Sequence, residues 1–281
     1  MKRVIIAVII TLLGIGTLAY PKISNYFSEL NGTQVIRSYS ESVAEHSDEE
    51  LQAAWDEAER YNESLMGSPV HDPFLEGSGM AQQDDYLKVL SLGGIMGYIE
   101  IPKIAVYLPI YHGTSEEVLN KGIGHLEGST MPIGGKNRHS VLTGHTGLVH
   151  AKLFTDLTEL EDGDMFFIHV LGKTLAYKVD QIKVVEPHDT EDLRRTGDGS
   201  DYCTLLTCTP YGINSHRLLV RGERVDFDPN DAGGMPQAAG TGIDGLMIAV
   251  AIITAAVMSV LVIAAILVSR KRRRDDEKQQ D

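Results

Sequence analysis

Two long apolar runs lie near the ends of the chain. Residues 4–20 carry no charge and follow Lys2 and Arg3, and residues 246–269 carry none and precede the basic sequence RKRRR. Each run could cross the hydrocarbon core of a bilayer, which takes roughly 17 to 25 apolar residues. We therefore expect a membrane anchor or a cleaved signal segment at residues 1–20 and a transmembrane helix at residues 246–269.

The polar stretch after the first run contains one amphipathic pattern. The sequence SDEE at 47–50 supplies an N-cap and an acidic first turn, and apolar residues then recur every three or four positions as far as residue 65. This pattern predicts a helix over 47–65 that packs on a domain through one face. Residues 67–85 are rich in Gly, Ser, Pro and Asp and predict a loop, so we assign 21–85 to a helical N-terminal region.

Beyond residue 86 the pattern changes to short apolar runs separated by turn residues. These runs predict strands over 97–100, 105–111, 140–143, 165–170, 175–185, 202–207 and 217–225. Short helices are expected over 115–120, 151–157 and 190–195. Many short strands with few helices favour a mainly β fold, a closed and largely antiparallel barrel over 86–228, followed by a linker over 229–245.

The charge distribution adds a topology. The basic flank at 270–281 predicts a cytoplasmic tail, so both termini are expected inside and residues 21–245 outside. Of 25 basic and 39 acidic residues, 17 and 35 lie within 21–245, a formal charge of −18 for that segment. So acidic a surface disfavours nucleic acid and bare anionic lipid as partners.

The two cysteines, Cys203 and Cys208, lie in one predicted strand. Five residues of extended chain cover about 16 Å, whereas bridged Cα atoms lie within about 7 Å of each other. A disulfide between them would break the strand. Cys208 is therefore expected to be a free thiol at a strand end, either a small buried residue or a nucleophile.

Two more residues are placed near Cys208 by the pattern. If the strands on either side of TPYGINSH form a hairpin, Arg217 faces Cys208 across it, while Arg221 lies about 13 Å further along. A thiol also needs a base at neutral pH. His145 is the candidate at a strand end, whereas His139 lies at the other end of that strand and His216 inside the loop. On spacing alone, ordinary structural roles for these residues stay open.

Several motifs together resemble the class C sortases, the pilin-polymerising transpeptidases of Gram-positive bacteria. TLLTC, with an arginine nine residues after its Cys, is similar to their nucleophile motif, and LTGHTG is similar to their histidine motif. The two apolar runs and HDPF ahead of the barrel are also similar to the class C pattern. The resemblance implies an eight-stranded sortase barrel preceded by a helix and a lid.

The resemblance also implies a role for each residue of the site. Cys208 would be the nucleophile, His145 the acid and base, Arg217 the oxyanion and substrate binder, and Thr207 a supporting residue. In the lid, Asp72 would pair with Arg217 and Phe74 would cover Cys208.

The activity implied is cleavage of an LPxTG-like sorting signal through a thioacyl-enzyme, with transfer to a lysine amine of a pilin subunit. Attachment of proteins to peptidoglycan, or a non-catalytic surface adhesin, are the alternatives. No cofactor is expected. The sequence DFDPND at 226–231 begins like a calcium loop, but Asp231 and Gln237 stand where that loop needs Gly and Glu, so no metal site is expected.

Overall fold

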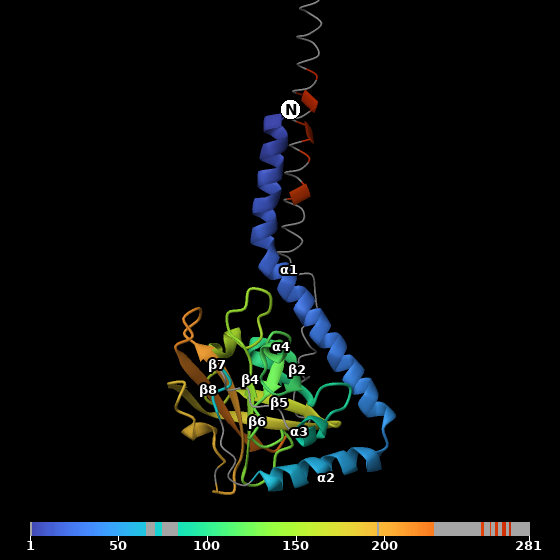
Figure 1. Ribbon diagram of the computed structural model, residues 1–281, viewed down its shortest axis with the longest axis vertical. Coiled ribbons are helices and arrows are strands. Elements are labelled where there is room, and N and C mark those ends of the chain that lie inside the picture. The colour runs from blue at the N-terminus through green and yellow to red at the C-terminus, as the bar shows by residue number, and fades with distance from the viewer. Residues whose placement is uncertain are drawn as a thin grey trace, which may run out of the picture. The chain divides into compact units, whose positions relative to one another are not determined.

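The computed structural model describes residues 2–65, 71–74, 84–195 and 197–227, together with residues 254, 255, 259, 262, 263, 266, 267 and 270. The chain forms two compact units, Phe27–Gly240 and Met1–Tyr26 with Thr241–Asp281 (Figure 1). The helices and 3₁₀-helices are α1 (Lys2–Glu45), α2 (Asp48–Ser64), α3 (Asp84–Lys88), η1 (Pro102–Ile104), α4 (Glu116–Leu119), η2 (Thr155–Glu159) and η3 (Glu191–Leu193). The strands are β1 (Gly97–Ile101), β2 (Val106–His112), β3 (Ile123–His125), β4 (Arg138–Thr143), β5 (Met165–Val170), β6 (Lys173–Val185), β7 (Asp201–Thr209) and β8 (His216–Val225).

The unit that holds both chain ends contains the first part of α1. This helix includes the apolar run 4–20 and continues through Pro21. Among the described residues, no helix combines the length and the apolar character that crossing a membrane requires. The linker at 229–245, most of the run at 246–269 and all but the first residue of the tail at 270–281 lie outside the described residues. The expected domain boundaries and membrane topology therefore stay predictions.

The larger unit is built on a closed barrel of eight strands. Its strand order is β1-β2-β3-β4-β7-β8-β6-β5, and every neighbouring pair is antiparallel except β2 with β3 and β4 with β7. The prediction of a closed, largely antiparallel barrel is confirmed. Strand β3 was not predicted, because its three residues are one isoleucine, one glycine and one histidine and show no alternating pattern.

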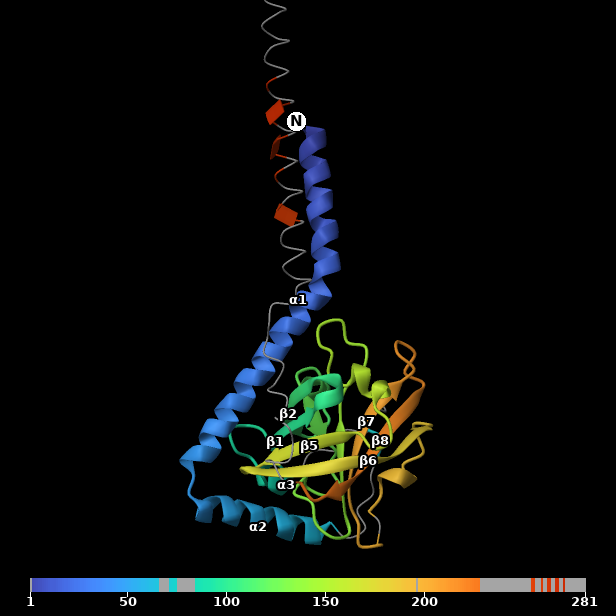
Figure 2. The same cartoon turned by 180° about the vertical axis from the view of Figure 1, so that it is seen from behind.

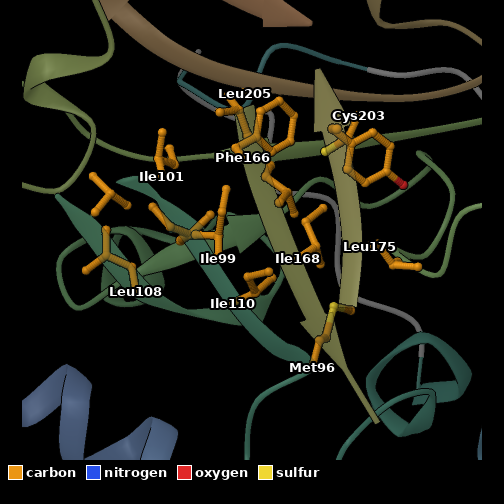
Figure 3. Packing of buried hydrophobic residues seen from close by; sticks show 14 of the residues in the cluster. Met96, Ile99, Ile101, Leu108, Ile110, Phe166, Ile168, Leu175, Cys203 and Leu205 are labelled. Carbon is orange, nitrogen blue, oxygen red and sulfur yellow. The ribbon is translucent and has the colours of Figure 1, made fainter. Parts of the chain in front are cut away.

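The interior of the barrel is filled by alternate residues of its strands. Ile99 and Ile101 of β1, Phe166 and Ile168 of β5, and Leu205 of β7 point into one continuous apolar cluster (Figure 3). Alternation of this kind is the period-2 signal by which the strands were predicted.

The predicted helices differ in how well they match the structure. The helix expected over 47–65 is α2, and Ser47 and Glu50 form its capping box. The helix expected over 115–120 is α4, capped by Ser115. The helices expected over 151–157 and 190–195 were wrong in type and extent, because these loops contain only the 3₁₀ turns η2 and η3.

The N-terminal region is fastened to one end of the barrel. Glu59 of α2 forms an ion pair of 2.9 Å with Arg138, at the start of β4. Asn62 of α2 accepts a hydrogen bond of 2.6 Å from the backbone N–H of Met131. Since Arg138 is the first residue of β4, α2 covers the end of the barrel at which β4 begins (Figure 2). The other end of the barrel is the one that carries the candidate site.

Candidate active site

The hairpin of β7 and β8 brings Cys208 and Arg217 together. The two residues are direct partners in the antiparallel register, as predicted from their spacing. Arg217 Nη1 donates hydrogen bonds of 3.2 Å to the carbonyl oxygens of Asn214 and His216. His216 is the exposed first residue of β8 and not part of the loop as expected.

Cys208 and Cys203 are both free and lie five residues apart in β7, so their side chains point to opposite faces of the sheet. Cys203 belongs to the barrel interior. Cys208 lies on the outer face, beside Arg217.

His145 follows β4, which runs parallel to β7 with Thr143 opposite Leu206. The strand ends at Thr143, as predicted, and His145 lies two residues beyond it. A hydrogen bond of 2.7 Å from Thr207 Oγ1 to the carbonyl oxygen of Gly144 then ties the residue before Cys208 to the residue before His145. Thr207 thereby fixes the two backbone segments that carry the thiol and the imidazole.

Asp72 reaches the same place from a segment outside the barrel strands. Its carboxylate accepts a hydrogen bond of 3.0 Å from Arg217 Nε and lies 2.8 Å from Arg217 Nη2. Both side chains are buried, with 3% and 6% of their surface exposed. The same carboxylate accepts a hydrogen bond of 3.0 Å from the backbone N–H of Phe74. The expected contact between Asp72 and Arg217 is therefore present, and the hydrogen bond from Phe74 closes the Asp72–Phe74 turn on itself.

The ring of Phe74 lies close to both His145 and Arg217. Its centroid is 5.5 Å from that of the His145 ring and 5.1 Å from the guanidinium carbon of Arg217. Phe74 also packs on an outer apolar cluster of Leu126, Val141, Leu193, Leu206 and Leu219. The cover that Phe74 was expected to give Cys208 stays a prediction.

The environment moves the two reactive groups apart in pKa. Burial raises the pKa of the Cys208 thiol; the charge of Arg217 opposes this shift and that of Asp72 adds to it. Burial lowers the pKa of His145, while the charge of Glu116 raises it and that of His150 lowers it further. With Asp72 in place, neutral thiol and neutral imidazole are the dominant forms near pH 7.

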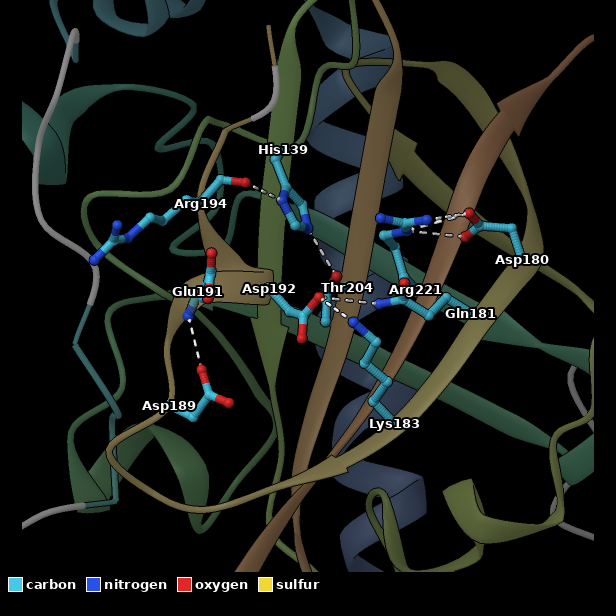
Figure 4. A network of polar contacts seen from close by, with 10 residues as sticks. All are labelled: His139, Asp180, Gln181, Lys183, Asp189, Glu191, Asp192, Arg194, Thr204 and Arg221. Atoms are coloured by element: carbon cyan, nitrogen blue, oxygen red, sulfur yellow. Dashed lines mark hydrogen bonds and ion pairs between the residues drawn. The ribbon is translucent and has the colours of Figure 1, made fainter. Parts of the chain in front are cut away.

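A polar network lies further down the same outer face (Figure 4). His139 is within hydrogen-bond distance of the carbonyl oxygen of Arg194, at 2.8 Å, and of Thr204 Oγ1, at 2.7 Å. Lys183 Nζ lies 2.6 Å from Asp192 Oδ1. These contacts fasten the connection between β6 and β7 to the sheet, so His139 has a structural position. No pattern in the sequence predicts this network beyond the outward parity of Thr204.

No cluster of three or more His, Cys, Asp or Glu side chains that could hold a metal ion occurs within the described ranges. Of the calcium-loop-like sequence at 226–231, only residues 226 and 227 lie among the described residues.

Comparisons with known proteins agree with this geometry. Residues 99–225 match the model of the sortase domain. The crystal structure of sortase C-1 from Streptococcus pneumoniae is similar, with 46% identity and a TM-score of 0.66 over 69% of this chain and 100% of that one. The structure of sortase C1 of GBS pilus island 1 has 41% identity and a TM-score of 0.64, over 73% and 96% of the two chains.

A match to sortase D of Bacillus subtilis covers less of either protein. It has 33% identity over 136 residues, which are 47% of this chain and 65% of that protein. The chain thus spans less than two thirds of the length of this curated relative.

Proposed function

Because this chain belongs to the sortase family of cysteine transpeptidases, and its solved relatives are class C sortases, we propose that it cleaves an LPxTG-like sorting signal and joins it to a lysine of a pilin subunit. The observation that carries the proposal is the arrangement of Cys208, Arg217 and His145, held together by the register of β7 with β8 and by the Thr207 hydrogen bond. Sortase C1 of GBS pilus island 1, a relative named after a pilus locus, supports the choice of a pilin as acceptor.

The first half-reaction in this proposal forms a thioacyl-enzyme. The thiolate of Cys208 attacks the carbonyl carbon of the threonine residue in the signal, and a C–S bond forms. Arg217, which stays charged and carries several donors, stabilises the negative oxygen that develops. The C–N bond to glycine then breaks, and the leaving amine takes its proton from the imidazolium of His145.

The second half-reaction reverses the roles. An uncharged acceptor amine attacks the thioester carbonyl, a C–N bond forms and the C–S bond breaks. The amine proton passes to His145, and the electron pair stays on Cys208 as thiolate. The enzyme is thereby returned to the thiolate and imidazolium pair that begins the next cycle.

The Asp72–Phe74 turn acts as a lid in this proposal. Asp72 occupies the guanidinium that would bind the oxyanion, and its charge raises the pKa of the Cys208 thiol beyond the effect of burial. Exchange of the turn for a substrate carbonyl would remove both obstacles at once.

We also propose that the enzyme is held in the cell membrane by the apolar runs at 4–20 and 246–269, with the barrel outside and both termini in the cytoplasm, unless the first run is cleaved. A tag at the C-terminus should then resist protease added to intact cells, whereas a tag in the β7–β8 loop should be removed. Cleavage of both tags would contradict this topology.

The test of the reaction is mass spectrometry of the full chain in detergent with candidate sorting peptides. A covalent adduct on Cys208, with the mass of the peptide up to its threonine, is expected for the wild type and for Asp72→Ala, and none for Cys208→Ala. Pilin subunits should then be joined into SDS-resistant ladders. Use of a peptidoglycan stem-peptide amine instead would indicate a wall-anchoring sortase, and absence of the adduct from both wild type and Asp72→Ala would contradict the proposal.

A further inference from the structure

The helix α4 lies against β3, the neighbour of the strand β4 that leads to His145. Gly124 of β3 pairs directly with Thr143 at the end of β4, two residues before His145. A methyl group at Gly124 would come within 2.3 Å of the Gly113 carbonyl oxygen and within 3.1 Å of the Leu119 side chain. Since neighbouring strands are about 4.8 Å apart, α4 and the turn before it lie within roughly 10 Å of the His145 backbone.

The start of α4 is held in place and presents a carboxylate to solvent. Ser115 caps the helix by accepting a hydrogen bond from the backbone N–H of Val118. The turn before it is anchored by the buried Tyr86, whose hydroxyl accepts a hydrogen bond of 2.8 Å from the backbone N–H of Gly113. Glu116 is exposed, and the structure gives its carboxylate no hydrogen bond or ion pair to any described residue.

Glu116 and Glu117 differ in two properties that matter for ligand binding, their electrostatic effect on His145 and their ion pairing. The charge of Glu116 acts on the imidazole of His145. Glu117 instead forms an ion pair of 3.2 Å with Lys121 on its own helix. Glu116 is therefore a negative charge without an ion-pair partner among the described residues, on a helix that packs against β3, the strand paired with the end of β4.

The side of the site on which Glu116 lies is set by the lid. Asp72 and Phe74 lie beside Arg217, on the face formed by β7 and β8. The ring of Phe74 also lies near the ring of His145. The helix α4, which carries Glu116, packs against β3, and β3 lies across β4 from that face. The donor signal would replace the lid, which leaves the α4 side for the second substrate.

We propose that Glu116 binds the ammonium group of the acceptor lysine and delivers it to the α4 side of the thioacyl-enzyme. The inference rests on the proposed function, because it assumes an amine acceptor. A lysine side chain arrives as a cation, and a carboxylate is the group that attracts it. Before attack the ammonium gives one proton to water; the resulting amine then forms the C–N bond, and its second proton goes to His145 as Cys208 leaves with the C–S electron pair.

The experiment compares two acceptors on the thioacyl-enzyme of the full chain. One is a lysine peptide with its α-amine blocked, which is cationic at pH 7.5, and the other is hydroxylamine, which is mostly uncharged there. For Glu116→Gln we expect the KM for the lysine peptide to rise about two- to fivefold, in the range of one solvent-exposed ion pair. The rate with hydroxylamine and the rate of thioacyl-enzyme formation should stay within about twofold of wild type.

Matched variants and salt complete the test. Glu117→Gln, which breaks only the pair with Lys121, should behave as wild type. Glu116→Asp should keep a KM for the lysine peptide close to that of the wild type. The difference between Glu116→Gln and wild type should shrink in 1 M salt, where the screening length is about 3 Å. An equal loss with both acceptors, or an unchanged KM for the lysine peptide, would overturn the assignment of Glu116 while leaving the thioacyl chemistry intact. Failure of the wild type and of Asp72→Ala to form the thioacyl-enzyme would instead count against the proposed function.

Discussion

Two arginine–aspartate pairs lie four residues apart on the outer face of β8, and they differ in burial and in the origin of the aspartate. Arg217 pairs with Asp72 at 2.8 Å, and their side chains are 6% and 3% exposed. Arg221 pairs with Asp180 at 2.5 Å, and their side chains are 19% and 26% exposed. Asp180 belongs to β6, the strand next to β8, as Figure 4 shows. Asp72 comes from a turn that belongs to no strand.

This difference separates a pair that joins two strands of the barrel from a pair that, in the proposed lid, would control access to the Cys208 thiol. The Arg221 pair joins two strands that are already hydrogen-bonded, so the backbones of the two partners stay adjacent whether or not the ion pair forms. The Arg217 pair joins the sheet to a separate turn, and a buried arginine left without a partner is costly. A ligand that offers Arg217 a negatively charged oxygen can therefore replace Asp72 without opening any strand.

The largest expected difference between the two pairs is in catalysis. Arg217→Gln should lower kcat/KM for transpeptidation by about 10² to 10³, the usual cost of losing a donor to a developing oxyanion. Arg221→Gln should leave kcat/KM within about threefold of wild type, because this side chain points to β6 and stacks on Tyr202. Steady-state kinetics of both variants, with circular dichroism to check folding, decide the matter. Equal losses would abolish the distinction between the two pairs.

The second prediction concerns access to the thiol. Asp72→Ala should raise the alkylation rate of Cys208 by iodoacetamide at pH 7.5 about tenfold or more, whereas Asp180→Ala should leave it unchanged. Removal of Asp72 frees the turn and also removes a negative charge that raises the thiol pKa, so a larger fraction of Cys208 is thiolate at pH 7.5.

The pH dependence of alkylation tests the effect of the Asp72 charge on the pKa of Cys208. Since burial raises the pKa of Cys208, the wild-type rate should still increase with pH above the pKa of an ordinary thiol. The midpoint of the rate profile in Asp72→Ala should lie at lower pH than in the wild type. Cys208→Ser supplies the blank for alkylation of Cys203. Identical midpoints and rates in the two proteins would mean that Asp72 does not guard the thiol.

The sequence predicted much of this comparison and missed one part for a physical reason. The alternation along β7 and β8 was enough to place Cys208 opposite Arg217 and to set Arg221 apart, because register in a hairpin follows from the period of two. The approach of Asp72 was expected only from the resemblance to class C sortases. No local pattern predicts a contact between residues 145 positions apart, since it depends on how a loop folds back over the finished barrel.

The histidines also divide into one that the local pattern predicts and one whose role depends on tertiary contacts. His145 is predicted from its place at a strand end, whereas the structural role of His139 depends on contacts with Arg194 and Thr204 that no local pattern shows. The position of Glu116 beside His145 was missed because it depends on β3, a strand too short to be recognised in the sequence.

A third prediction tests whether the site depends on Thr207 as well as on the charges. Thr207→Val keeps the shape but removes the donor to the Gly144 carbonyl, and a buried carbonyl without a partner costs about 1–3 kcal/mol. We expect kcat to fall about tenfold with a KM for the sorting peptide close to wild type, because the change displaces His145 and leaves the substrate contacts intact. Thr207→Ser should restore most of the rate. A rise in KM with unchanged kcat would instead assign Thr207 to substrate binding.

The smallest expected effect is the energy of the Arg221 pair itself. Unfolding of Arg221→Ala, Asp180→Ala and the double variant in urea should give a coupling energy of about 1 kcal/mol or less, since partly exposed pairs are screened by solvent. The same cycle on Arg217 and Asp72 should give a larger coupling, because Arg217→Ala strands a buried carboxylate and Asp72→Ala strands a buried guanidinium unless the turn moves away. Asp72→Ala alone should then cost less than Arg217→Ala, because the freed turn lets water reach Arg217. If both single variants cost the same, the turn stays in place without its ion pair, and the lid is held by Phe74 on the outer apolar cluster and not by charge.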